Sequence, residues 1–384
     1  MTEKKVRKTK LKNPFDYTLL FIVLFLVGFG LIMIYSTSSY EAAQSYGSST
    51  FFLRKQILAV IIGLVAMIVV ANINYRFWAN FATLAYLTAV GLLLAIIPFG
   101  KEVNGAKRWL YIGPFSLQPA EVAKLCMILF LAVMVHKIGK KIRTIKGFFT
   151  VLLMPVPIVL MVWKITNNLS SAIIIFGIAI LMIFVASPDY KKFVIVGGFV
   201  VAGVVGLILA IKFGLLETLD FRGERILAWL DPEAYADGKG FQTLQALYAI
   251  GSGGIWGKGL GQSMQKLGFI PEAQNDMIFS IICEELGLFG AVAIILMFLL
   301  LIWRLMDIAM KAPDLFSALL VVGVMGHIAI QVILNIAVVT NTIPNTGISL
   351  PFISYGGSSV TFLLIEFGLV FNVATHTKNN KEVN

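Results

Sequence analysis

The sequence is poor in charged residues, in cysteine and in histidine. Only 13% of its 384 residues are charged and 58% are hydrophobic, whereas soluble domains are about one quarter charged. This composition excludes a soluble globular protein and indicates an integral membrane protein. The two cysteines, Cys126 and Cys283, both fall in apolar runs, so a disulfide framework is not indicated. With three histidines and no histidine–cysteine cluster, no metal site made by the protein alone is expected.

Sequence signatures of several protein classes are missing as well. The chain contains neither a P-loop nor the Gly-x-Ser-x-Gly elbow of serine hydrolases. The net charge of +11 suggests nucleic acid, but the basic residues gather in short connectors between apolar runs. That distribution is typical of membrane orientation and excludes nucleic acid as a partner. A basic tail, Lys4–Lys12, precedes the first apolar run, and no cleavage site follows, so we expect a retained anchor.

Ten apolar runs are long enough to cross a bilayer, which takes about 20 residues of helix. They lie at 17–37, 56–73, 77–98, 118–136, 147–163, 170–187, 193–213, 277–303, 315–340 and 351–375. The sequence therefore predicts an all-α fold, a single polytopic bundle of about ten transmembrane helices that takes up residues 1–384. The short runs at 147–163 and 170–187 are expected to form a tight helical hairpin.

Lysine and arginine are concentrated on one side of the predicted bundle. The N-terminal tail carries six of them and the connector 137–146 carries five. The other basic positions expected on this side are Arg76, Lys191, Lys192, Arg304, Lys311, Lys378 and Lys381. Because short basic loops stay in the cytoplasm, both termini are expected inside. The loops at 38–55, 99–117, 214–276 and 341–350 then face outward, and 214–276 is the one large extracellular loop.

The large loop ends in an acidic residue at the predicted membrane boundary. Asp276 lies in the stretch Pro271-Glu-Ala-Gln-Asn-Asp-Met-Ile-Phe, directly before the eighth apolar run. An ionisable group at membrane depth is costly and is generally functional, although aspartate also caps helix N-termini. We expect Asp276 to act as a general base with an ordinary pKa of about 4. Helix capping alone is the alternative interpretation.

Candidate ligand-binding residues occur in two outer loops. The large loop contains the glycine-rich run 251–261, whose backbone can approach a ligand closely and whose Lys258 suits a diphosphate. In the loop 99–117, Arg108 stands beside Trp109 and can bind a phosphate bidentately. The alternative is a flexible loop in which the glycines only turn the chain and the cations decorate its surface.

Polar residues also occur within the apolar runs. Glu121 and Lys124 are three residues apart on one helical face and are expected to pair. His327 is expected to be a satisfied interior group rather than a metal ligand. The full set of candidate substrate-binding residues is Arg108, Lys258, Gln245, Glu121, Lys124 and Glu285.

These segments, taken in order, resemble the SEDS family of bacterial membrane proteins, which includes FtsW, RodA and SpoVE. The matching stretches are Asn104-Gly-Ala-Lys-Arg-Trp, Gln118-Pro-Ala-Glu-Val-Ala-Lys, Gly240-Phe-Gln, Ala249-Ile-Gly-Ser-Gly-Gly, Gly257-Lys-Gly-Leu-Gly, the Asp276 stretch with Glu284-Glu-Leu-Gly, and Leu350-Pro-Phe-Ile-Ser-Tyr-Gly-Gly-Ser-Ser. The resemblance covers nearly the whole chain and favours FtsW or SpoVE over RodA. Many members have Pro-Asp-Leu-Gly where this chain has Asn167-Asn168-Leu169-Ser170, so no role for an acid is carried over there.

The resemblance implies a peptidoglycan glycosyltransferase of the bacterial cytoplasmic membrane, with the family's essential loop aspartate at Asp276. Such an enzyme polymerises lipid II into glycan strands at the outer face, for cell division or cell-shape growth, and releases undecaprenyl diphosphate. The implied partners are lipid II, the nascent strand, a class B penicillin-binding protein as transpeptidase, and divisome or elongasome membrane proteins. No permanently bound cofactor is expected, and a divalent cation (Mg²⁺ or Mn²⁺) is compatible with the diphosphate.

Two alternatives from other functional classes follow from the same residues. A lipid II flippase needs a polar path through the bundle, and the residues that would line it are Glu121, Lys124, His327, Gln331 and Glu366. A non-catalytic membrane scaffold of a cell-wall synthase complex needs only helix surface. The enzyme is favoured because polar and glycine-rich material is concentrated on the outer side, whereas a flippase should show such material on both sides.

Overall fold

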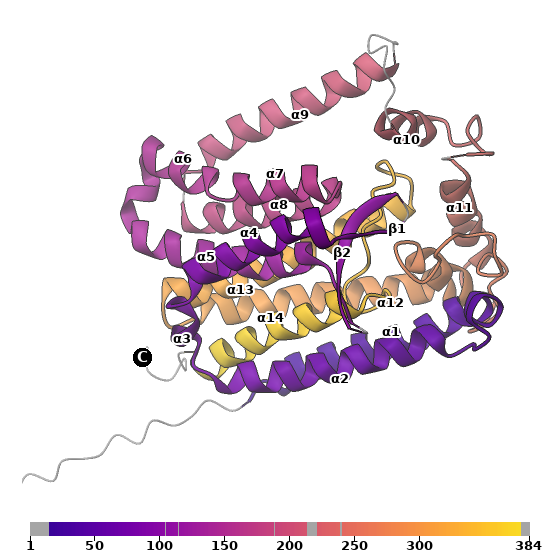
Figure 1. Ribbon diagram of the computed structural model, residues 1–384, viewed down its shortest axis with the longest axis horizontal. Coiled ribbons are helices and arrows are strands. Elements are labelled where there is room, and N and C mark those ends of the chain that lie inside the picture. The colour runs from indigo at the N-terminus through magenta and orange to yellow at the C-terminus, as the bar shows by residue number, and fades with distance from the viewer. Residues whose placement is uncertain are drawn as a thin grey trace, which may run out of the picture.

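The computed structural model describes residues 15–103, 105–113, 115–187, 189–212, 221–238 and 240–377. Most of the described helices lie side by side and form one bundle (Figure 1). Parts of the sequence-based predictions fall outside the described residues: the basic tail Lys4–Lys12, Asn104, the first part of the large loop at 213–220, and Lys378 and Lys381.

Ten helical segments among the described residues are long and apolar enough to cross a membrane. They are α1 (Tyr17–Tyr46), α2 (Phe51–Asn72), α4 (Ala82–Phe99), α5 (Pro119–Ile138) continued by η1 (Gly139–Arg143), α6 (Ile145–Leu153) continued by α7 (Val156–Ile165), α8 (Leu169–Ala186), α9 (Tyr190–Lys212), α12 (Ile278–Met310), α13 (Leu315–Val339) and α14 (Gly357–Thr375). The predicted number and order of spans are therefore confirmed. The expected hairpin is also present, because α7 and α8 pack together across a short turn.

Several span boundaries differ from the prediction, and two of the differences have a clear physical reason or consequence. Helix α1 continues to Tyr46, well beyond residue 37. Its polar residues are satisfied within the helix, because Thr37 and Ser38 donate from their hydroxyls to the carbonyls of Met33 and Ile34 at 2.8 and 2.6 Å. Helix α14 begins only at Gly357, and the predicted first turn at 351–356 is instead irregular backbone.

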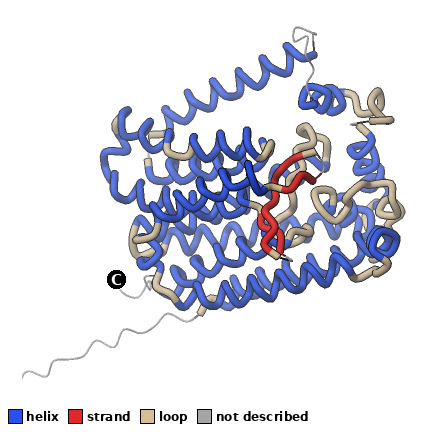
Figure 2. Tube along the Cα trace, in the orientation of Figure 1, coloured by secondary structure: helices blue, strands red, loops and turns tan. Residues whose placement is uncertain are grey.

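The outer loops contain structure that the all-α prediction missed. Strands β1 (Lys101–Val103), β2 (Ala106–Ile112) and β3 (Phe115–Leu117) form an antiparallel sheet in the order β1-β2-β3 (Figure 2). The large loop holds two helices, α10 (Phe221–Leu230) and α11 (Phe241–Gly253), and α3 (Tyr75–Ala79) lies between α2 and α4. Along β2 the buried Ala106 and Leu110 are followed by the exposed Lys107 and Tyr111, which is the period-two alternation of a half-buried strand.

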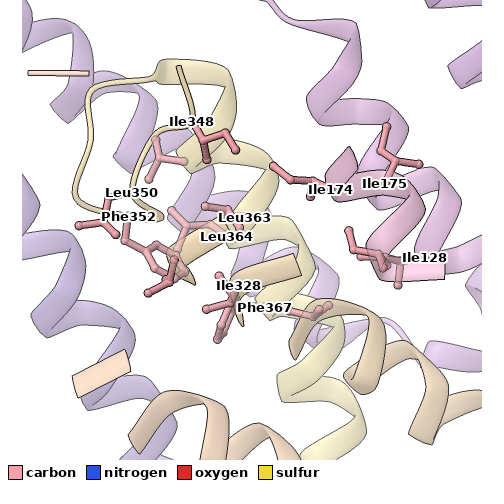
Figure 3. Packing of buried hydrophobic residues seen from close by; sticks show 14 of the residues in the cluster. Ile128, Ile174, Ile175, Ile328, Ile348, Leu350, Phe352, Leu363, Leu364 and Phe367 are labelled. Carbon is pink, nitrogen blue, oxygen red and sulfur yellow. The ribbon is translucent and has the colours of Figure 1, made fainter. Parts of the chain in front are cut away.

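Helix α13 is central to the bundle and packs against α5, α8, α12 and α14. Buried aliphatic and aromatic side chains fill these contacts: α13 contributes Ile328, and its neighbours α5, α8 and α14 contribute Ile128, Ile174 and Phe367 (Figure 3). Close backbone contacts add to this packing: a Cβ at Gly30 of α1 would lie 2.4 Å from the Phe352 carbonyl oxygen. The turn before α14 is thus wedged against α1.

The connectors between the helices lie at two ends of the bundle. At one end, Asp314 accepts hydrogen bonds from Tyr75 at 2.8 Å and from Arg76 at 3.4 Å, and Lys192 donates to the carbonyl of Arg143 at 2.6 Å. These are connectors predicted to share the basic side. At the other end lie α10, α11 and the loop before α14 (Figure 1). Which end faces the cytoplasm rests on the basic-residue pattern and stays a prediction.

Candidate active site

Asp276 lies in the turn that leads into α12, and a side chain of α13 fixes its backbone. Asn335 is fully buried and donates from Nδ2 to the carbonyl of Asp276 at 2.8 Å and to that of Ile348 at 2.7 Å. The N-cap position of α12 is Met277, so Asp276 stands one residue before the cap. Its carboxylate is therefore not in the position from which a capping side chain serves the helix.

The turn before α14 supports the same segment from a second direction. Ser354 donates from its hydroxyl to the carbonyl of Asn275 at 2.6 Å, and the Tyr355 N–H donates to that of Gln274 at 2.9 Å. The Leu350 N–H in turn donates to the Ser354 hydroxyl at 2.7 Å. The backbone that carries Asp276 is thus held by contacts from α13 and from the turn before α14.

Burial raises the pKa of the Asp276 carboxyl to about 6. The negative charge of Glu272 adds to this rise, while backbone N–H groups and the Arg225 guanidinium act in the opposite direction and lower the pKa. The value near 4 expected from the sequence is therefore wrong, because desolvation by folded neighbours cannot be seen in a linear pattern. The carboxyl remains mostly ionised at neutral pH and is a stronger base than an exposed aspartate.

The predicted Glu121–Lys124 pair is confirmed, and it lies close to the Asp276 segment. Lys124 Nζ is 2.7 Å from Glu121 Oε1 and 3.5 Å from Gln331 Oε1, and Lys124 is almost fully buried. Gln331 donates to the carbonyl of Ser349 at 2.8 Å. Because Gln331 and Asn335 stand four residues apart on α13, roughly one helical turn of 5.4 Å separates the Lys124 layer from the one that holds Asp276.

A second buried pair lies deeper in the bundle. His327 Nδ1 of α13 is 2.8 Å from Glu366 Oε2 of α14, and both side chains are almost fully buried. The interior position expected for His327 is confirmed, although its Nε2 and the second Glu366 oxygen have no hydrogen-bond partner among the described residues. The ionisable residues named for a polar path are thus engaged in two pairs, one within α5 and one between α13 and α14.

Glu285 lies beneath the large loop and not on an open surface. Glu285 and its neighbour Glu284 on α12 are both fully buried. Glu285 is 2.8 Å from Lys266 Nζ and accepts a hydrogen bond from the Ser36 hydroxyl at 2.7 Å. Glu284 is 2.7 Å from Lys258 Nζ. The two ion pairs attach the loop to α12. A role for Glu285 in substrate binding stays a prediction, as does that of Lys258, whose side chain remains 34% exposed.

The glycine-rich run packs its backbone directly onto α12. At Gly287 the helix is interrupted, with φ 67° and ψ −167°. Here the N–H groups of Lys258 and Gly259 donate to the carbonyls of Glu284 and Glu285, both at 2.9 Å. A Cβ at Gly257 would lie 2.2 Å from the Glu285 carbonyl oxygen. At this position the glycine is required by close backbone contact.

Arg108 and Gln245, two further candidates, lie on separate elements. Arg108 of β2 donates from Nε and Nη2 to the carbonyls of Thr166 and Asn167 at 3.2 and 3.0 Å, and burial lowers the pKa of its guanidinium. Asn168, which replaces the family's aspartate, caps α8 by accepting from the Ser171 N–H at 3.0 Å. Gln245 is partly buried on α11. Substrate binding by either candidate stays a prediction.

Sequence reasoning missed a cavity of about 230 Å³ beside the Asp276 segment. Its polar and aromatic lining includes Arg225, Trp229, Phe241, Gln242 and Asn345. Arg225 and Trp229 are four residues apart on α10, and this helical spacing was a usable signal. The positioning residue Asn335 was missed too, although an asparagine in an apolar run, four residues after Gln331, is unusual enough to have indicated it.

In the part of the chain that the structure describes, no three His, Cys, Asp or Glu side chains come together as ligands for a metal ion. Asp276 is one carboxylate ligand of the kind that Mg²⁺ accepts. A divalent cation here would therefore take most of its ligands from the substrate's diphosphate and from water, and it stays a prediction.

The family comparison agrees with this arrangement. A family model described as "Cell cycle protein", which groups FtsW, RodA and SpoVE, matches residues 17–379. The chain belongs to this family. The resemblance seen in the motifs is therefore confirmed, and the matched range includes the helix bundle, the large loop and Asp276.

Individual relatives span almost the whole chain. Stage V sporulation protein E of Bacillus subtilis is 41% identical over 372 residues, which cover 96% of this chain and 99% of that protein. A probable peptidoglycan glycosyltransferase FtsW of Geobacter metallireducens is 38% identical, with 95% and 96% covered. These names agree with the subtype expected from the motifs.

Solved structures match the fold over a similar range. A chain from the structure "Structural coordination of polymerization and crosslinking by a peptidoglycan synthase complex" has a TM-score of 0.78 at 28% identity, covering 94% of this chain and 98% of that one. The rod shape determining protein RodA of Thermus thermophilus has a TM-score of 0.69 at 25% identity, with 96% and 99% covered. The helical membrane fold is thus shared with both.

Proposed function

We propose that this protein is a peptidoglycan glycosyltransferase that polymerises lipid II at the outer face of the bacterial cytoplasmic membrane, with Asp276 as its general base. The enzyme class follows from the family and from the relatives named as peptidoglycan glycosyltransferases. The observation that carries the catalytic assignment is the Asp276 carboxyl itself, held in place through its backbone and raised in pKa to about 6.

The reaction needs one base and a stabilised leaving group. Asp276 accepts the proton of the acceptor sugar hydroxyl, whose oxygen then attacks the anomeric carbon of the donor sugar. A new glycosidic C–O bond forms, and the bond between that carbon and the diphosphate oxygen breaks. Undecaprenyl diphosphate leaves with the electron pair and needs no acid, because a diphosphate is stable as an anion. The products are a lengthened β-1,4-linked strand and the lipid diphosphate.

Three cations are candidates for stabilising the charge that develops on the diphosphate. Lys124 lies about one helical turn from the layer that holds Asp276. Lys258 is paired with Glu284 and is partly exposed. Because a lysine ammonium has three donors, Lys258 can also donate to a diphosphate. Arg108 retains donors beyond the two bonds it makes to the α7–α8 turn. We assign these three residues to the diphosphate, and Glu121 to holding Lys124 in position.

The proposed partner is a transpeptidase, a class B penicillin-binding protein, within a divisome or elongasome. This rests on the similar chain found in a peptidoglycan synthase complex that coordinates polymerization with crosslinking. Such a partner would act on the strands at the face of the membrane where they are made.

The test is polymerisation of fluorescently labelled lipid II by the purified protein, with and without its transpeptidase. We expect glycan strands from the protein, with the partner raising the rate. A parallel assay follows labelled lipid II across sealed vesicles. Transbilayer movement without strand formation would favour a flippase, and neither activity in the presence of the partner would favour a scaffold.

A further inference from the structure

The cavity beside Asp276 is a preformed pocket between α10, α11 and the loop before α14. Arg225 and Trp229 on α10 contact that loop directly: the guanidinium donates to the carbonyl of Asn345 at 3.2 Å, and the indole N–H donates to that of Asn341 at 3.0 Å. These bonds join segments more than 100 residues apart in the chain. The outer wall of the pocket is therefore fixed by tertiary contacts.

A second set of hydrogen bonds cross-links the lining in the same way. Gln242 of α11 donates from Nε2 to the carbonyl of Pro271 at 3.3 Å, and Asn345 donates from Nδ2 to Gln242 Oε1 at 3.0 Å. Pro271 belongs to the segment that leads to Asp276. A movement of the pocket wall is thus coupled to the backbone that carries the carboxylate.

The pocket adjoins the Asp276 carboxylate. The Gly347 N–H donates to Asn345 Oδ1 at 3.0 Å, and a Cβ built at Gly347 would lie 3.8 Å from Asp276 Oδ2. The Arg225 guanidinium on the pocket wall also lowers the Asp276 pKa by its charge. The loop 345–347 therefore runs from the pocket lining to the Asp276 carboxylate, and Pro271 of the lining begins the segment that carries it.

The lining selects a class of ligand. It combines ring faces from Trp229 and Phe241 with two amides and one guanidinium, and it includes no acidic side chain. Without an acid it does not suit a cation, and with a single cation it does not suit a diphosphate. Because α10 and α11 lie outside the spans, it does not suit a polyprenyl tail. Aromatic faces with amide donors and acceptors suit a sugar ring.

The volume of the pocket limits the size of the ligand. At about 230 Å³ it is smaller than sites for drug-sized ligands, which begin at roughly 300 Å³. One pyranose ring with an acetamido group fits this scale, and a stem peptide does not. Each amide side chain already makes one bond through its NH2 group and one through its oxygen within the protein, so Gln242 and Asn345 retain a second N–H and a second oxygen lone pair for an acetamido group.

We infer that the pocket formed by Arg225, Trp229, Phe241, Gln242 and Asn345 is a subsite for one N-acetylated hexose of the glycan substrate. This inference rests on the proposed function and adds to it the place at which a sugar ring next to the reacting bond is held. The ring belongs either to the growing strand or to the incoming lipid-linked unit, and both carry the same chemistry.

The direct test is binding of the soluble N-acetylglucosamine tetramer to the purified full-length protein, followed by saturation-transfer NMR at the acetyl methyl groups. The informative variants are Phe241→Ala, which removes a ring face from an exposed position, and Gln242→Ala, which removes an amide. The matched control is Tyr248→Ala, an exposed aromatic of the same helix. We expect wild type and the control to bind alike and both pocket variants to bind at least fivefold more weakly.

Polymerisation kinetics identify the source of the sugar. If the pocket holds the growing strand, the pocket variants make shorter products at an unchanged KM for lipid II. If it holds the incoming unit, they raise KM with product length unchanged. The inference is overturned if the wild type does not bind the tetramer, or if both variants match the control in binding and in kinetics. Because binding is read without turnover, loss of the proposed function would appear separately, as a wild type that makes no strands.

Discussion

The raised pKa of Asp276 predicts an acid limb in the pH profile of polymerisation. The catalytic form is the carboxylate, which is present above the pKa and lost as the pH falls through about 6. About nine tenths of the groups are ionised at pH 7, and about one tenth at pH 5. The value of kcat/KM should therefore fall about tenfold between these two pH values. An aspartate with an ordinary pKa near about 4 would lose only about a tenth of its activity over the same range.

Two substitutions should move this limb in opposite directions. Glu272→Gln removes a negative charge that raises the Asp276 pKa, so the limb should shift to lower pH. The glutamine keeps an acceptor for the Asn275 amide, which donates to Glu272 Oε2 at 2.9 Å. Arg225→Gln removes a positive charge that lowers the pKa, so the limb should shift to higher pH.

The assay is kcat/KM for labelled lipid II polymerisation between pH 4.5 and pH 8, because this profile reports the pKa values of the substrate-free enzyme. Thermal unfolding at each pH identifies any loss of fold. A flat wild-type profile down to pH 5, with the protein folded, would refute the desolvated-base argument. So would shifts of the same sign in the two variants.

Three further predictions concern fold and position. Asn335→Ala leaves the carbonyls of Asp276 and Ile348 without their donor. The free energy of unfolding, measured by thermal unfolding, should fall by about 1–3 kcal/mol for each lost bond, and the polymerisation rate should fall as well. An unchanged rate would contradict the positioning role of Asn335. Gly257→Ala should destabilise the protein in the same measurement, since its φ is +78° and the new Cβ meets backbone at 2.2 Å. Gly251→Ala, at a helical position with open space around it, should not destabilise the protein. If both termini are inside, a cysteine at position 141 should react with an impermeant thiol reagent only after the membrane is permeabilised. A cysteine at position 235 should react from outside intact protoplasts. The reverse pattern would contradict the predicted orientation.

The spans could be predicted from the sequence because bilayer thickness sets their length. The elements that were missed lie outside the bilayer, where that constraint is absent. The sheet at 101–117 and the helices α10 and α11 carry only short amphipathic patterns. Helix α1 was predicted too short because Thr37 and Ser38 look like a loop signal, while in the fold their hydroxyls bond back to the helix.

The candidate site could be predicted only where its partners are close in sequence. Glu121 and Lys124 share one turn of helix, so their ion pair followed from spacing. Asn335 and the Asp276 carbonyl are 59 residues apart, and Arg225 and Asn345 are 120 apart. Such contacts, and the desolvation that raises the pKa of Asp276, arise only when the bundle assembles.

The most direct test of the central claim is the polymerisation rate of Asp276→Asn, which keeps the shape of the side chain and removes its basicity. Loss of a general base should cost on the order of 100-fold or more, while Asp237→Asn, the same change at an exposed position of the same loop, should keep wild-type activity. The variant should also be at least as stable as wild type at pH 7, because the raised pKa of the partly buried Asp276 carboxyl means that its charge is unfavourable in the folded state. Near-normal polymerisation by a folded Asp276→Asn protein would contradict the assignment of Asp276 as the catalytic base.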